Sequence, residues 1–120
     1  MKIPDASHPI AITPEAGRVT VRAGGQVIAV SNAALVLREA SYPPVFYIPR
    51  ADARMDLLER TERSTHCPYK GDASYFSIPA AGGAGANAVW SYEAPSPAVA
   101  QIAGHLAFYA DRVEISVAPL

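Results

Sequence analysis

Residues 18–30, which read RVTVRAGGQVIAV, decide the fold class of this chain. Arg18 to Arg22 alternates polar and apolar side chains, which is typical of a strand with one buried face. Gln26 to Val30 is a second apolar run, rich in β-branched residues. Gly24 and Gly25 lie between the two runs and can adopt the positive φ angles that tight hairpin turns require. The stretch therefore predicts a β-hairpin.

Similar short runs continue along the rest of the chain and predict six further strands. Asp111 and Arg112 separate the last two runs and predict a tight turn between them. The expected strands are Ala34–Glu39, Val45–Ile48, Ala73–Ile78, Ala88–Tyr92, Leu106–Tyr109 and Val113–Val117. About eight short strands favour a mainly-β fold, either a curled antiparallel sheet or a partly open barrel.

Helical signals are few. Ala51 to Arg60 is the best candidate, because Asp52 could cap it while Met55 and Leu58 would share an apolar side. Ser96 to Ile102 could add a short helical turn after Pro95. The polar stretch from Thr61 to Gly71 is expected to be a loop. We therefore expect one or two short helices at most.

Length and composition indicate one domain that spans residues 1–120. Half of the 120 residues are hydrophobic and the net charge is −1, so no bulk positive charge is available for nucleic acid. Cys67 is the only cysteine, which excludes an internal disulfide and a cysteine-rich zinc site. The three histidines are scattered, so we expect no metal and no cofactor.

The chain shows neither a leader pattern nor a membrane-spanning apolar run, so we expect a cytoplasmic protein that does not bind membranes. The sequence does not decide whether the protein forms a homo-oligomer.

The segment Thr65-His66-Cys67-Pro68-Tyr69-Lys70-Gly71 places a thiol between an imidazole and an ammonium group. A nearby cation stabilises a thiolate, so Cys67 could be a catalytic nucleophile with Lys70 as its stabiliser and His66 or Tyr69 as proton donor. The alternative is that Cys67 is a small buried hydrophobic residue. In that case Lys70 is a solvated charge or the partner of a carboxylate, and the carboxylate is Glu39 or Asp52.

Aromatic side chains with polar tips recur in neighbouring segments. Trp90 and Tyr92 share one face of an expected strand, because strand side chains repeat every two residues. Tyr47, Tyr69 and Tyr75 lie in other segments that could converge on the same place. Such rings can form the walls of a ligand pocket while their hydroxyl groups orient the ligand, or they can simply fill the core.

Four motifs together resemble a bacterial family of unknown function, the domain-of-unknown-function 427 family, sometimes labelled nucleotidyltransferase-like. The motifs are Tyr47-x-Pro49-x-x-Asp52, Cys67-Pro68-Tyr69-Lys70-Gly71-x-Ala73-x-Tyr75, Trp90-Ser91-Tyr92-x-x-Pro95 and Ile102-x-Gly104-x-x-Ala107-Phe108-Tyr109. The motif-bearing body runs from about residue 18 to 117.

The resemblance implies a β-tent fold, in which two antiparallel sheets meet at an angle. Other members of that fold group include a guanine-nucleotide-exchange chaperone and the B-type methionine sulfoxide reductases. The nucleotidyltransferase label has no support in the residues, because the chain has neither a Gly-Ser pair nor an Asp-x-Asp. The reductase analogy would leave only a single-thiol mechanism with an external reductant.

Three functions follow from the sequence. The first is a module that binds a small molecule or peptide in a pocket near the 67–70 loop, with walls from the tyrosines and Trp90. The second is a single-thiol enzyme that uses Cys67. The third is a structural or interaction domain without a ligand.

Overall fold

The computed structural model describes residues 1–120 and shows a mainly-β chain with ten strands in three antiparallel sheets. The first six strands are β1 (Ile10–Pro14), β2 (Arg18–Ala23), β3 (Gln26–Ser31), β4 (Leu35–Glu39), β5 (Val45–Tyr47) and β6 (Glu59–Cys67). The others are β7 (Gly71–Ser77), β8 (Val89–Ser91), β9 (Ala107–Phe108) and β10 (Glu114–Ala118). Four short 3-10 segments connect them: η1 (Arg50–Asp52), η2 (Met55–Leu57), η3 (Pro79–Gly85) and η4 (Pro97–Ile102).

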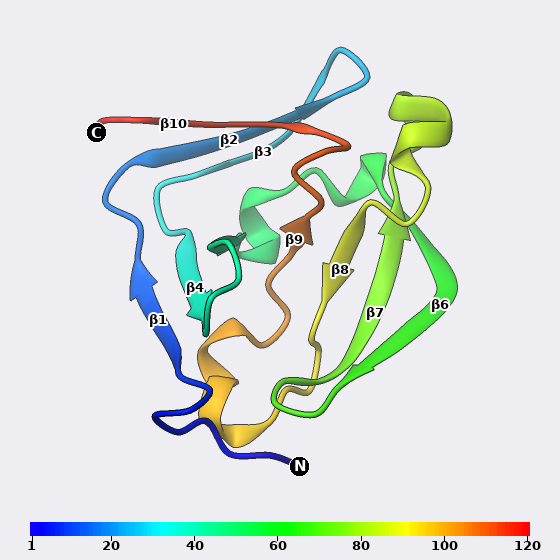
Figure 1. The fold of residues 1–120 in the computed structure, drawn as a ribbon. Coiled ribbons are helices and arrows are strands. Elements are labelled where there is room, and N and C mark those ends of the chain that lie inside the picture. The colour runs from blue at the N-terminus through cyan, green and yellow to red at the C-terminus, as the bar shows by residue number, and fades with distance from the viewer.

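The three sheets meet at angles rather than closing into a barrel. Their strand orders are β1-β4-β5, β10-β2-β3 and β6-β7-β8-β9. Figure 1 shows β10 beside β2 and β3 across the top of the view, with β1 and β4 on the left and β6, β7 and β8 on the right. The mainly-β, antiparallel prediction is confirmed, with three sheets where two were expected. None of the helical segments is long and apolar enough to cross a membrane.

The hairpin predicted from residues 18–30 is present. Strands β2 and β3 pair antiparallel up to Ala23 and Gln26, and the turn residues Gly24 and Gly25 have φ angles of 56° and 76°. A side chain at Gly24 would also collide with a neighbouring segment, because its Cβ would lie 2.0 Å from the Ala80 carbonyl oxygen. The first glycine is therefore required for both the turn and the close approach of η3.

The helix predicted over Ala51–Arg60 is wrong. Only the two 3-10 turns η1 and η2 form there, because the backbone between them pairs with β3. Ala53 forms an isolated bridge with Ala29, and the Arg54 N–H donates to the Ile28 carbonyl at 2.8 Å. Asp52 consequently caps no helix. These tertiary hydrogen bonds satisfy the backbone groups that a helix would have used internally.

The loop expected over Thr61–Gly71 is also wrong, because most of this segment belongs to the nine-residue strand β6. The inward positions of β6 are occupied by Thr61, Thr65 and Cys67, so no hydrophobic alternation marks it as a strand. β6 lies at the edge of its sheet, where charged side chains are common because they protect the open edge.

Two further differences concern the chain ends. The strand β1 was not predicted, although it pairs with β4 along its whole length. The turn at Asp111-Arg112 is present, since the Arg112 N–H donates to the Tyr109 carbonyl at 3.0 Å. The strands on either side of that turn do not pair with each other, however: β9 joins β8 and β10 joins β2.

Two hydrophobic clusters form the core. The larger cluster includes Val19, Ile28, Ile48 and Phe108, and lies between the three-stranded β10-β2-β3 sheet and the four-stranded sheet. The smaller cluster gathers Leu37, Tyr47, Tyr75, Tyr92 and their neighbours, with Cys67 and Trp90 packed against it. The second cluster contains most of the aromatic residues that the sequence singled out.

Candidate functional site

A cavity of about 190 Å³ opens at the smaller core cluster and brings residues from distant segments together. Strands β4, β5, β7 and β8 supply its walls, with the β6–β7 turn and the segments before β5, after β8 and after β9. Its lining residues are Leu37, Glu39, Tyr42, Pro43, Val45, Tyr47, Lys70, Tyr75, Trp90, Tyr92 and Tyr109. The register of the sheets explains part of this convergence, because β7 and β8 place Tyr75 opposite Trp90.

The polar wall of the cavity is a buried ion pair. The Lys70 ammonium donates to Glu39 Oε1, and the two side chains are 13% and 11% exposed. His8 Nε2 donates to the other carboxylate oxygen at 2.7 Å. Burial alone would raise the pKa of Glu39, but the hydrogen bonds from Lys70 and His8 outweigh it and hold that pKa below its ordinary value of 4.5. The sequence left Glu39 and Asp52 as possible partners of Lys70, and in the structure Lys70 pairs with Glu39.

The aromatic wall is held by hydrogen bonds between rings. The Trp90 indole N–H donates to the Tyr47 hydroxyl oxygen at 3.3 Å, with the two rings edge to face. Tyr75 joins Thr65 at 2.9 Å and Tyr109 at 3.5 Å through its hydroxyl. Burial would raise the pKa of Tyr75, but these hydrogen bonds and Arg63 lower it overall, whereas burial raises the pKa of Tyr109 to about 12.

The cavity continues into a larger apolar groove of about 490 Å³. Tyr42, Pro43, Val45, Trp90 and Tyr109 line both spaces. Beyond them the groove is walled by Pro44, Phe46, Phe108, Ala110, Ile115 and Val117, so it ends against strand β10. Small-molecule pockets usually have volumes of about 300–1,000 Å³. The cavity therefore fits one side chain or ring, and the groove offers room for whatever is attached to it.

Four of the residues singled out in the sequence lie outside the cavity lining. Cys67 is half-buried against the smaller core cluster, and its sulfur makes no hydrogen bond. His66 points away on the opposite face of β6, where its exposed ring contacts Asp72 at 2.7 Å. Tyr69 stacks on His8 with 3.9 Å between ring centroids. Asp52 accepts a 2.6 Å hydrogen bond from the buried Ser31 hydroxyl and braces η1 against β3.

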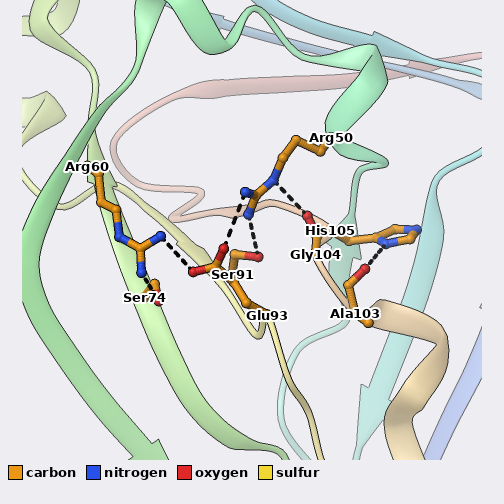
Figure 2. A network of polar contacts seen from close by, with 8 residues as sticks. All are labelled: Arg50, Arg60, Ser74, Ser91, Glu93, Ala103, Gly104 and His105. Atoms are coloured by element: carbon orange, nitrogen blue, oxygen red, sulfur yellow. Dashed lines mark hydrogen bonds and ion pairs between the residues drawn. The ribbon is translucent and has the colours of Figure 1, made fainter.

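A second polar network lies on the other face of the four-stranded sheet. Figure 2 shows the Glu93 carboxylate between the guanidinium groups of Arg50 and Arg60, at 3.4 Å and 2.8 Å. Arg50 also donates to the Ser91 hydroxyl at 3.1 Å and to the Gly104 carbonyl at 3.0 Å. The network ties η1 to the segments that follow β8 and precede β9, and so stabilises the strand that carries Trp90.

Sequence patterns did not indicate several residues of the site. His8 and Tyr42 are single residues outside the strand patterns, and Tyr109 ends the expected strand Leu106–Tyr109 without being singled out as a site residue. The network of Arg50, Arg60 and Glu93 spans 43 positions of the chain. The available signals for Tyr109 were a polar-tipped aromatic side chain at a strand end and its place in the fourth motif. No three His, Cys, Asp or Glu side chains gather closely enough to hold a metal ion.

The sequence matches one known protein family. A family model described as a domain of unknown function, DUF427, matches residues 11–119. The chain belongs to this family. No curated protein matches the sequence. The match begins at the second residue of β1 and ends just after β10, so it includes nine strands in full, most of β1 and every residue that lines the cavity.

Proposed function

We propose that this DUF427 protein is a binding module for a small molecule or a peptide side chain. The observation that carries the proposal is the cavity itself, which is lined by six aromatic rings and by the Glu39–Lys70 ion pair. Rings and a few oriented polar groups in a concave site are the usual composition of ligand pockets. The adjoining groove supports a ligand that extends beyond the cavity.

The single-thiol enzyme draws no support from the contacts around Cys67. Lys70 donates to Glu39, and His66 contacts Asp72 on the far face of the strand. A catalytic thiol needs a cation or base within hydrogen-bond reach, and the Cys67 sulfur has no hydrogen-bond partner. We therefore keep the binding module as the one candidate function.

The test uses the only tryptophan, Trp90, which lines both the cavity and the groove. Its indole fluorescence and N–H resonance should respond saturably to single-ring compounds. Native mass spectrometry of the freshly purified protein should also detect a bound molecule that denaturation releases.

A filled cavity provides the matched control. Val45 lines the cavity, so Val45→Phe should abolish the Trp90 response. Val30 lies on the outer side of β3, and Val30→Phe should leave the response unchanged. If the parent protein carries no co-purifying molecule and Trp90 responds to none of the compounds, the protein is a structural domain and the proposal fails.

A further inference from the structure

The cavity contains hydrogen-bond donors that nothing in the protein satisfies. Tyr92 is 7% exposed, and its hydroxyl makes no hydrogen bond within the chain. No fully buried side-chain oxygen or nitrogen lacks a partner, so the Tyr92 hydroxyl must reach open space. The open space that Tyr92 lines is the cavity. A residue that is more than nine-tenths buried but whose unpaired hydroxyl faces the cavity presents a donor to a ligand.

Tyr47 supplies a second unpaired donor. Its side chain is 1% exposed, and its oxygen accepts from the Trp90 indole N–H. The hydroxyl proton of Tyr47 itself has no acceptor in the protein. Both oxygens of Glu39 already accept, one from Lys70 and one from His8. The cavity therefore presents two hydroxyl protons without a partner, while both oxygens of the Glu39 carboxylate are already engaged.

We propose that the group held in this cavity carries an uncharged hydrogen-bond acceptor, a ketone or amide oxygen, on an apolar body about the size of one ring. The inference rests on the proposed binding function and specifies its ligand class. Tyr47 and Tyr92 donate to the carbonyl oxygen, and the aromatic walls enclose the ring. A cavity of about 150 Å³ can already hold benzene, so about 190 Å³ accommodates this body.

Charged groups fit the cavity less well than a neutral acceptor. A ligand cation would meet the Lys70 ammonium, which already lies 5.9 Å from the centre of the Tyr92 ring. A ligand anion would lie beside the Glu39 carboxylate. Burial, together with the negative charge of Glu39, raises the pKa of both Tyr47 and Tyr92, so the two hydroxyls stay protonated and can donate.

Four single-ring probes distinguish these chemistries: acetophenone, a neutral acceptor; toluene, with no polar group; benzoate, an anion; and benzylamine, a cation. Each is titrated while the Trp90 indole N–H resonance is followed by nuclear magnetic resonance. Acetophenone should bind about three- to tenfold more tightly than toluene, which is the usual contribution of one or two neutral hydrogen bonds. Benzoate and benzylamine should bind more weakly than toluene.

Tyr92→Phe tests the donor directly, because the hydroxyl makes no bond that folding requires. This variant should lose most of the advantage of acetophenone over toluene and keep the affinity for toluene. Tyr69→Phe, outside the cavity, is the matched control and should change neither affinity. The spectrum of the same sample reports whether each variant is folded.

The results distinguish failure of the acceptor inference from failure of the proposed binding function. If acetophenone and toluene bind equally, or if Tyr92→Phe leaves their ratio intact, the acceptor inference fails while the binding module stands. Tightest binding by benzoate or benzylamine also overturns the inference. If none of the four probes binds, including toluene, the acceptor inference fails, and the proposed function fails with it when the purified protein also carries no co-purifying molecule.

Discussion

Removing the ammonium group of Lys70 should destabilise the protein strongly. Lys70→Met keeps the aliphatic stem but leaves the Glu39 carboxylate, 11% exposed, with His8 as its remaining partner. Breaking a buried ion pair on one side costs about 3–5 kcal/mol, and the remaining histidine places this case near about 3 kcal/mol. The entropy of unfolding is about 2.1 cal/mol/K per residue, or about 0.25 kcal/mol/K for 120 residues. The melting temperature should therefore fall by about 12 °C.

Thermal unfolding followed by circular dichroism measures this shift, and two variants control it. Arg54→Met breaks the ion pair with Asp56, whose side chains are 60% and 63% exposed, and should melt like the parent. The double variant Glu39→Gln with Lys70→Met removes both charges and should recover part of the loss, because no buried charge is left unpaired. If Lys70→Met melts within about 2 °C of the parent, which corresponds to about 0.5 kcal/mol, the ion pair does not brace the site.

Three other outcomes follow from the same structure. Because the folded pKa of Glu39 is lowered, its contribution to stability is present above pH 4.5 and lost as pH falls through the folded value; the gap in melting temperature between the parent and Glu39→Gln should close in acid. Gly24→Ala should destabilise by at least about 2 kcal/mol because of its positive φ and the clash with Ala80, whereas Gly83→Ala, with open space around it, should not. Alkylation of Cys67 in the folded protein at pH 7 should not slow when the lysine is replaced; slower alkylation without a loss of stability would favour the thiol enzyme.

The strands with alternating side chains could be predicted because their pattern reports burial directly. In β2, Val19, Val21 and Ala23 are buried while Arg18 and Arg22 are exposed, as the sequence indicated. The segment from residue 51 to 67 could not be predicted in the same way. Its backbone conformation depends on hydrogen bonds to β3 and on an edge position in the sheet, and neither leaves a periodic pattern in the sequence.

The residues of the candidate site show the same difference between what local sequence patterns indicate and what tertiary contacts decide. The sequence by itself determined the mainly-β class, the Gly24-Gly25 turn, the family resemblance and four of the six aromatic residues that line the cavity, because these depend on side-chain pattern and on local backbone freedom. Only the tertiary structure decided that Lys70 pairs with Glu39 rather than Asp52 and that Cys67 has no polar partner. Glu39 and Lys70 lie 31 positions apart in the chain. Contacts over such separations are set by how the sheets pack, and no local spacing encodes them.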